Sequence, residues 1–344
     1  MTIATPVRPS ISAGLLAAFD KEFGDNSAYA MPTDFIDTGF APLNYILSGD
    51  YSRGLAFGRL YEVFGESSTG KTALATEWMA RAQKMGGCAG FIDWERSFNQ
   101  DLAVAGYNLC TDRPYWLYKK PMTWEEGNTA ATNYCKFIRE NKIIAANAPI
   151  LIVLDSIAAA VPRSMAEKEF DEYSMNDTTA LARVSSTTLR SIAMRAEMYN
   201  ATFVYLNQVR LKPGVVYGDP TTTPGGKSME FFATGRLSLS RKKVMQVVDG
   251  GKEFVGQDVG IKCVKSKMTM PNKSTSLRMS FDDNGMAYFD MELSLVEALV
   301  AEDKIKTPRN GYVEFDGKQY SKKAFADHIR LVGLTDQLVK LFSA

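Results

Sequence analysis

The sequence predicts an α/β fold in which a central, mostly parallel β-sheet is flanked by helices. Two observations predict this fold. Short apolar runs that suit buried parallel strands alternate along the chain with runs of helical period. One apolar run leads directly into a glycine-rich pattern of the kind that binds phosphate, and a helix-forming run follows that pattern. The apolar runs lie at residues 60–64, 88–93, 150–154 and 202–206.

Length and composition limit the domain organisation. With 344 residues, the chain has room for one large α/β domain and one or two small units. We expect a short N-terminal helical arm at 1–32, an α/β core at 33–288 and a small C-terminal α+β unit at 289–344. The C-terminal unit is expected to hold a helix near 292–303, a hairpin at 311–317 and a helix from Lys322.

Composition also excludes some classes of protein. Hydrophobic residues make up 45% of the chain and charged residues 23%, as in soluble globular proteins. No apolar run approaches the roughly 20 residues of a membrane-spanning helix, and the first residues lack the pattern of a secretory signal. We therefore expect a cytoplasmic protein with no membrane partner. The four cysteines form no C-x-x-C pair, so neither a disulfide framework nor a zinc site is predicted.

The first element along the chain is an amphipathic helix, expected at residues 10–23 and ending at Gly24. Its apolar stripe packs either on its own domain or on a neighbouring subunit. The sequence leaves both open. The stripe consists of Leu15, Leu16, Phe19 and Phe23.

The phosphate-binding pattern is the strongest single motif. It comprises Gly65, Glu66, Ser67, Ser68, Thr69, Gly70, Lys71 and Thr72. The two glycines let the backbone curl so that successive N–H groups point at phosphate oxygens, and the next helix offers its positive end to the same anion. Lys71 reaches the β- and γ-phosphates and Thr72 offers a hydroxyl to Mg²⁺. A glycine-rich surface turn is the alternative, but the strand and helix on either side favour a nucleoside triphosphate site.

Two carboxylates follow predicted strands. Ligands of open α/β sheets bind beyond the carboxyl ends of the strands. Glu95, two residues past the strand at 88–93, is therefore a candidate to orient water for attack on a γ-phosphate, with a solvated surface glutamate as the alternative. Asp155 ends the next strand and suits a carboxylate that supports Mg²⁺. An apolar run ending in aspartate is a weak signal alone, and the phosphate loop makes it a strong one.

The second half of the chain carries basic segments and a long loop. Helices are expected at 124–146 and 178–199, and the second places Arg183 and Arg190 on one face. The loop at 209–226 is rich in glycine and proline, and loops of that length are usually functional or disordered. Residues 260–281 hold five basic residues and no acid up to Phe281, in a pattern typical of antiparallel strands. These lysines form either a binding face or a solvated sheet edge that resists edge-to-edge pairing.

Several short motifs, taken together, give the chain a specific resemblance over residues 14–320. They are Lys21–Gly24, Thr38-Gly39, Gly58-Arg59, Glu66-Ser67-Ser68, Phe91-Ile92-Asp93-x-Glu95, Leu154-Asp155-Ser156, Asn207-Gln208-Val209-Arg210, Gly225-Gly226 and Val264-Lys265-Ser266-Lys267. With these motifs the chain resembles the bacterial and bacteriophage RecA-type recombinases. The resemblance implies a protein that binds ATP and Mg²⁺ and assembles into a helical filament on single-stranded DNA. It also implies pairing with homologous duplex DNA, strand exchange, and ATP hydrolysis stimulated by DNA.

The resemblance also implies roles for individual residues. Glu95 would activate water, Gln208 would sense the γ-phosphate, and Lys265 and Lys267 would reach ATP on the adjacent subunit. Segments 163–178 and 209–226 would be DNA-binding loops. The implied DNA-binding residues are Arg183, Arg190, Arg210, Lys212, Tyr217, Gly225, Gly226 and Lys227. Tyr217 would wedge or stack between bases, or would anchor its loop on the core.

The chain departs from the family pattern at the position that contacts adenine. Leu102 stands where the family has a tyrosine that stacks on adenine, and Tyr107 is the nearby ring that could replace it.

The sequence leaves two alternatives to a recombinase open, namely a helicase-like ring motor and an ATP-gated DNA-binding scaffold with little hydrolysis.

Overall fold

The computed structural model describes residues 12–24, 31–169, 179–211, 221–248, 251–282 and 285–343. The chain separates into two compact units, Met1–Thr33 and Asp34–Ala344. Among the described residues, no helix has both the length and the apolar character needed to cross a membrane.

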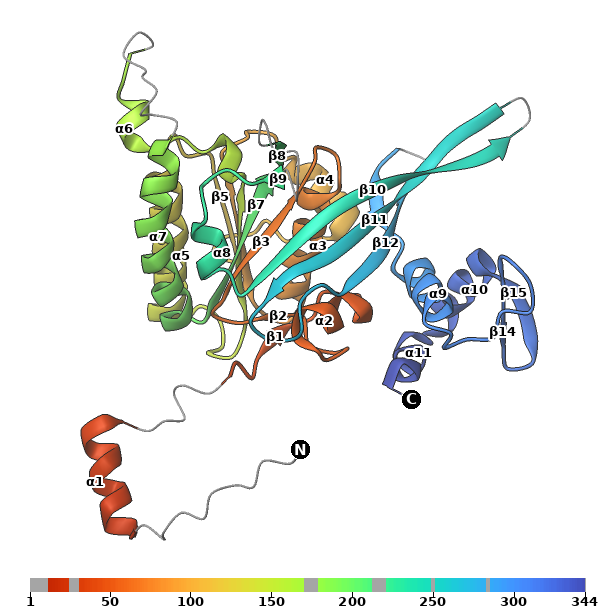
Figure 1. Cartoon of the computed structure of the whole chain (residues 1–344), viewed down its shortest axis with the longest axis horizontal. Coiled ribbons are helices and arrows are strands. Elements are labelled where there is room, and N and C mark those ends of the chain that lie inside the picture. Colours follow the sequence, from red (N-terminus) through yellow and green to blue (C-terminus); the bar gives the residue numbers. More distant parts are fainter. Residues whose placement is uncertain are drawn as a thin grey trace. The chain divides into compact units, whose positions relative to one another are not determined.

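The described part of the first unit, residues 12–24 and 31–33, contains the helix α1 (Ala13–Phe23) (Figure 1). It begins three residues later than the sequence predicts because the hydroxyl of Ser12 accepts a hydrogen bond from the Leu15 N–H and caps the helix. It ends as predicted at Gly24, whose N–H donates to the carbonyl of Asp20. Leu15, Leu16 and Phe19 are exposed, and the partner of this stripe stays a prediction.

The second unit is built on a large mixed sheet. Among the described residues it has nine strands, in the order β13-β12-β11-β10-β3-β7-β6-β4-β5. All neighbours from β10 to β5 pair in parallel, and β11, β12 and β13 extend the sheet by antiparallel pairing. The strands are β3 (Leu60–Gly65), β4 (Cys88–Asp93), β5 (Trp116–Lys119), β6 (Ile150–Asp155), β7 (Ala201–Gln208), β10 (Gly235–Val248), β11 (Gly251–Ser266), β12 (Ser274–Phe281) and β13 (Ala287–Phe289). The mostly parallel sheet that the sequence predicts is confirmed.

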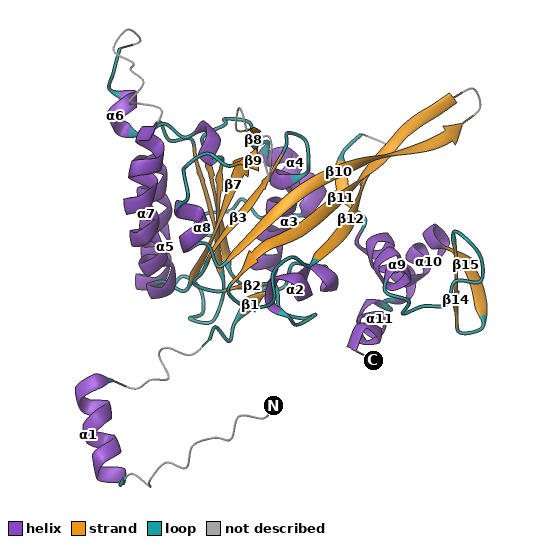
Figure 2. Ribbon diagram, viewed as in Figure 1, coloured by secondary structure: helices purple, strands orange, loops and turns teal. Residues whose placement is uncertain are grey.

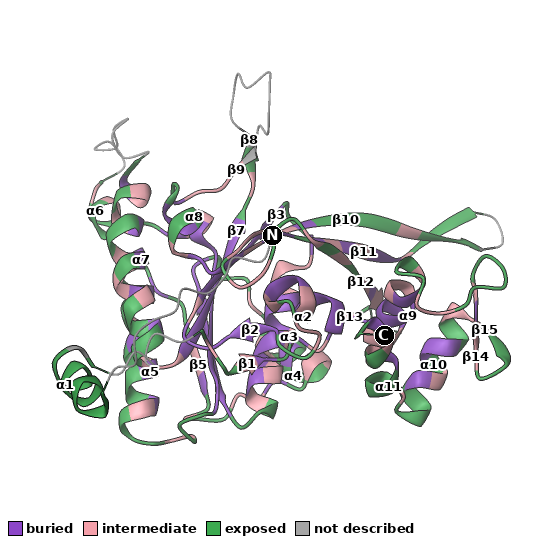
Figure 3. Cartoon of the chain, turned by 60° about the horizontal axis from the view of Figure 1, so that its bottom comes forward, coloured by how far each residue is buried: buried purple, intermediate pink, exposed green. Residues whose placement is uncertain are grey.

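Helices cover both faces of this sheet (Figure 2). One face carries α2 (Ala41–Ser48), α3 (Lys71–Lys84) and α4 (Gln100–Tyr107), and the other carries α5 (Trp124–Glu140), α7 (Ala180–Met198) and α8 (Ser228–Phe232). Each face has its own apolar cluster, centred on residues such as Trp78 on the first and Trp124 on the second. The central strands β3, β4 and β6 are buried along their whole length, and Figure 3 shows the middle of the sheet in the colour of buried residues. This burial explains their continuous apolar runs.

Helix α5 is shorter than the sequence predicts. It ends at Glu140 rather than near 146, and Lys142 just beyond it has a positive φ of 52° that a helix cannot continue. The guanidinium of Arg139 donates to the carbonyl oxygens of Ala145 and Ala148, which fixes the loop that follows.

The C-terminal residues form the predicted elements. These are α9 (Met291–Ala301), the hairpin β14 (Tyr312–Phe315) and β15 (Lys318–Ser321), and α10 (Lys322–Val332). A further short helix, α11 (Thr335–Val339), was not predicted. Their apolar residues belong to the same cluster as the α3 face, and the ring of Phe342 stacks 5.0 Å from that of Tyr51. The boundary at 288 stays a prediction.

Smaller elements connect these parts. They are β1 (Phe35–Ile36), β2 (Leu55–Ala56), a 3-10 turn (Ile157–Ala159), α6 (Arg163–Ala166), β8 (Arg210–Leu211), β9 (Thr221–Thr222) and a 3-10 turn (Lys340–Ser343).

Candidate functional site

The phosphate loop has the conformation that its sequence predicts. Gly65 ends β3 and Lys71 begins α3, and Gly70 between them has a φ of 87°, which favours glycine. The ammonium group of Lys71 donates to the carbonyl oxygens of Gly65 and Glu66, at 3.0 and 2.7 Å. Burial lowers the pKa of Lys71, and the carboxylates of Asp155 and Glu95 oppose that shift. The loop is thus closed around a cation that has no salt bridge in the described structure, which suits a ligand that brings negative charge.

The candidate Mg²⁺ residues meet at the start of α3. The hydroxyl of Thr72 donates to the carboxylate of Asp155 at 2.9 Å, although 83 residues separate them in the chain. Burial raises the pKa of Asp155 to about 7, and the nearby charge of Glu95 adds to the shift. A buried carboxylate beside a hydroxyl offers the hard oxygen ligands that Mg²⁺ takes together with phosphate oxygens. The residues present therefore fit a Mg²⁺-bound nucleotide.

Glu95 and Gln208 come together from different strands. The carboxylate of Glu95 accepts hydrogen bonds from the side-chain amide of Gln208 at 2.9 Å and from the hydroxyl of Ser156 at 2.5 Å. Asp93, buried at the end of β4, accepts from the backbone N–H groups of Ser97 and Phe98 and so fixes the turn that carries Glu95.

A single pocket contains Lys71, Thr72, Glu95, Asp155 and Gln208. It has a volume of about 280 Å³ and is lined by Ser67, Ser68, Thr69, Gly70, Lys71, Thr72, Ala73, Glu95, Asp155 and Gln208. Its residues come from the ends of β3, β4, β6 and β7, which are neighbours in the sheet. This is the edge at which open α/β sheets bind ligands.

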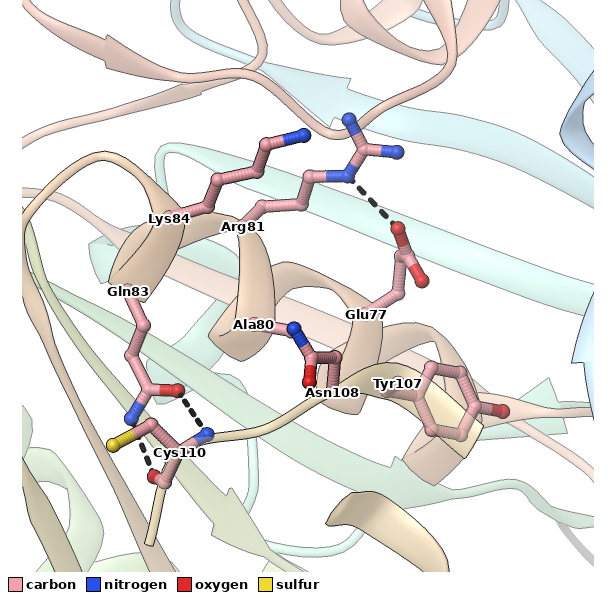
Figure 4. Close-up of a pocket in the computed structure, with 8 residues that line it drawn as sticks. All are labelled: Glu77, Ala80, Arg81, Gln83, Lys84, Tyr107, Asn108 and Cys110. Carbon is pink, nitrogen blue, oxygen red and sulfur yellow. Dashed lines mark hydrogen bonds and ion pairs between the residues drawn. The ribbon is translucent and has the colours of Figure 1, made fainter. Parts of the chain in front are cut away.

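A second, more apolar pocket of about 530 Å³ shares Thr72 and Ala73 with the first. Leu102 and Tyr107 both lie in its wall. The hydroxyl of Tyr107 donates to the carbonyl of Ala287 at 3.2 Å, which ties α4 to β13. A further hollow, shown in Figure 4, lies beside the second half of α3, where Gln83 binds the backbone of Cys110 and Arg81 pairs with Glu77. That hollow shares Tyr107 with the apolar pocket and holds none of the residues predicted to bind phosphate, Mg²⁺ or DNA.

The structure describes six of the predicted DNA-binding residues. They lie on α7 and at or next to the two ends of the 209–226 loop. Arg183 and Arg190 are exposed on α7. Gly225 and Gly226 have positive φ angles and press against Ile157 and the first turn of α7, because a Cβ on either glycine would come within 2.9 Å of a neighbouring side chain. Arg210 and Lys227 are also exposed. Lys212 and Tyr217 lie outside the described residues.

Neither Lys265 nor Lys267 is among the residues that line the phosphate pocket of its own chain as described. Lys265, in β11, donates from its ammonium to the carbonyl oxygens of Glu230 and Phe231 at the end of α8. Burial lowers the pKa of Lys265 to about 8, with the charge of Lys267 as the next cause.

The structure also adds residues that the sequence analysis gave no role. Buried Glu62 binds Arg236 at 2.5 Å and Asn207 at 2.8 Å. Asn207 donates as well to the carbonyl of Pro224 at 3.0 Å. This network joins the residue before Gln208 to the end of the 209–226 loop. Ser156 and Asn207 belong to motifs that the sequence analysis names, so their position near the site could have been inferred. No local sequence pattern indicates a role for Glu62 or Arg236.

Comparisons with known proteins show which family the chain belongs to. Residues 13–286 match the family model described as the RecA N-terminal domain. Protein RecA of Paenarthrobacter aurescens strain TC1 is 30% identical over 98% of this chain and 93% of its own length. Protein RecA of Saccharopolyspora erythraea is 34% identical over 78% of this chain and 74% of its own length, and Protein RecA of Chloroflexus aggregans is 34% identical over 78% and 72%. Nothing in these comparisons favours the ring motor or the scaffold. The chain belongs to the RecA family of DNA recombinases.

Proposed function

We propose that this chain is a DNA-dependent ATPase that assembles on single-stranded DNA as a helical filament and exchanges strands with homologous duplex DNA. The observation that carries the proposal is the single pocket that joins Lys71, Thr72, Glu95, Asp155 and Gln208. These groups offer a cation and a hydroxyl for phosphates and metal, a carboxylate for water, and an amide beside that carboxylate.

Within this site each residue has a distinct task. Lys71 exchanges its two backbone carbonyl partners for phosphate oxygens and places one positive charge where negative charge develops. Mg²⁺, when bound near Thr72 and Asp155, neutralises phosphate charge. Glu95 orients the attacking water and accepts its proton. Because Gln208 donates to Glu95, a γ-phosphate that draws the amide away frees that carboxylate for water.

The nucleobase occupies the larger apolar pocket beside Thr72 and Ala73. Leu102 supplies an aliphatic wall where the family has a stacking ring. Tyr107 lines the same pocket, but its hydroxyl is engaged by Ala287, so it closes the pocket from a fixed position.

Lys265 and Lys267 serve the ATP of an adjacent subunit. The absence of both lysines from the described lining of their own chain's phosphate pocket supports this assignment. In the free subunit Lys265 is held by two carbonyl groups of α8, and assembly transfers its ammonium from these dipoles to phosphate. The charge it supplies resembles an arginine finger provided by a neighbour.

DNA is bound mainly through its phosphates. Arg183, Arg190, Arg210 and Lys227 are exposed basic residues on the elements next to the two proposed loops. Binding should therefore weaken steeply as salt rises and depend little on base sequence. A flat salt response would contradict this part of the proposal.

The decisive experiment is a strand-exchange assay with circular single-stranded DNA, homologous linear duplex and Mg-ATP. We expect joint molecules with the wild-type chain, none with a heterologous duplex and none with Lys71→Ala. Absence of joint molecules, although the chain binds ATP and DNA, would refute the recombinase function.

A mixing experiment tests the site shared between subunits. Lys71→Ala has intact lysines and a defective loop, and the double variant Lys265→Ala with Lys267→Ala has the converse. Each should be inactive alone, and a mixture should regain part of the DNA-dependent ATPase activity because some interfaces join two intact halves. If mixed filaments form and remain inactive, the lysines do not act on the neighbour's ATP.

A further inference from the structure

Gln257 reaches the phosphate loop from a strand that carries none of the loop's sequence motif. It lies in β11, where it pairs with Lys243 of β10 and Met279 of β12. Its side chain is buried, with 6% exposure. The amide nitrogen donates to the backbone carbonyl of Ser68 at 3.2 Å and lies 3.4 Å from the sulfur of Met279. The buried side-chain amide of Gln257 therefore donates a hydrogen bond to one backbone carbonyl of the phosphate loop.

The contact falls on the most constrained part of the loop. Ser68 has a φ of 59°, a left-handed conformation that costs energy for a residue with a Cβ. Two residues later, Gly70 packs so closely on β12 that a Cβ there would lie 2.9 Å from the methyl of Met279. Strands β11 and β12, which extend the sheet by antiparallel pairing, therefore support the second half of the loop. Gln257 of β11 donates the hydrogen bond to it.

Peptide geometry links this hydrogen bond to phosphate binding. The bond between Ser68 and Thr69 is not among the cis peptides of the chain, so its C=O and N–H point in opposite directions. A carbonyl of Ser68 held toward β11 turns the N–H of Thr69 away from the sheet extension. Rotation of that peptide would replace a donor with a carbonyl oxygen on the face that receives an anion.

Gln257 is itself held firmly in place. Next to it, Gly256 lies so close to β12 that a Cβ would come within 2.4 Å of the carbonyl of Met279. The register of β10 and β11 also shifts nearby, between Val244 and Met245. In the part that the structure describes, the outer ends of these two strands pair with each other alone and extend beyond the rest of the sheet (Figure 1). Gln257 lies at the base of this projection, on the same strand as Lys265.

The geometry points to Gln257 as a positioning residue that orients the Ser68–Thr69 peptide for phosphate and couples the loop to β11. This inference rests on the proposed nucleotide site and adds to it a residue outside the loop. It makes β11 a continuous connection from the ATP of its own chain, at Gln257, to the ATP of the neighbour, at Lys265.

The test is an equilibrium titration of the full chain with a fluorescent ADP analogue, without DNA. Gln257→Met keeps the length and packing of the side chain and removes the donor. We expect its Kd to rise about fivefold to tenfold, the size of one lost hydrogen bond. The melting temperature without nucleotide should move little, and the rise in melting temperature on adding nucleotide should shrink. The matched control is Gln246→Met, the same change at an exposed position of the same hairpin, which should leave the Kd unchanged.

A second variant, Gln257→Glu, gives a further measurement, the pH dependence of its affinity for nucleotide. This dependence would not appear if Gln257 only stabilised the fold. In Gln257→Glu, an ionised carboxylate would face the carbonyl of Ser68 and repel it, whereas a protonated carboxyl group would donate to it. Burial raises the pKa of such a carboxyl group. Its affinity for nucleotide, relative to the wild type at the same pH, should therefore recover as pH falls from about 8 to about 5.5.

The outcomes separate the two proposals. A Gln257→Met chain that binds nucleotide as tightly as the wild type overturns the positioning role, and so does one that melts earlier with an unchanged Kd. An affinity of Gln257→Glu that is independent of pH relative to the wild type also counts against it. If Lys71→Ala binds nucleotide as tightly as the wild type, the proposed site itself fails, and the role of Gln257 fails with it.

Discussion

Replacing Arg236 by methionine should destabilise the fold strongly, because it leaves the buried charge of Glu62 without its cationic partner. Glu62 is fully buried, and Arg236 donates to it at 2.5 Å with only 12% of its own side chain exposed. Removing one partner of a buried ion pair typically costs 3–5 kcal/mol, since the remaining charge keeps its desolvation penalty. Asn207 still donates to Glu62 at 2.8 Å, so we expect a loss of about 3 kcal/mol, at the lower end of that range.

A double-mutant cycle tests the cause as well as the size. Glu62→Gln alone should cost about 1–2 kcal/mol, because the amide can still bond Asn207 and Arg236 keeps a second carboxylate, Glu230, at 3.7 Å. The combination of Glu62→Gln with Arg236→Met removes both charges. It should therefore be more stable than Arg236→Met alone.

The measurement is urea unfolding without nucleotide, followed by the fluorescence of the four tryptophans. Arg241→Met, at an exposed position of the same strand, is the control and should change the free energy of unfolding little. A cost below about 1 kcal/mol for Arg236→Met, or strict additivity of the two changes, would refute the idea that the pair is electrostatically coupled.

Three further predictions follow from the same contacts. Glu95→Gln should still bind ATP but lose roughly two orders of magnitude in hydrolysis; loss of binding in a nucleotide titration would instead make Glu95 structural. The pKa of Lys265, near 8 in the free subunit, should rise when phosphate faces it, so assembly with ATP takes up a proton. Filament formation, followed by light scattering, should thus be strongest below pH 8 and weaken above it by at most about tenfold per pH unit, and Lys265→Arg should abolish this dependence. Phe342→Ala, which removes the ring stacked on Tyr51, should lower the free energy of unfolding by roughly 3 kcal/mol; an unchanged urea midpoint would show that the C-terminal turn does not stabilise the core.

The sequence by itself determined the parts of this protein whose physics is local. The phosphate loop needs glycines at fixed positions and a lysine at the start of a helix, so the motif can be recognised within eight residues. The central strands are buried on both faces, so they appear as uninterrupted apolar runs. Glu95 and Asp155 could be proposed because the carboxyl ends of parallel strands meet at one edge of a sheet.

Only the tertiary structure decided which distant residues share a partner. Thr72 meets Asp155, and Gln208 meets Glu95, through pairings of strands far apart in the chain. Gln257 stands 189 residues from the carbonyl that it binds, and a glutamine within an alternating strand carries no local signal of its task. Which buried donor reaches which backbone oxygen depends on strand order and register, and these are set by packing of the whole sheet rather than by any short stretch of sequence.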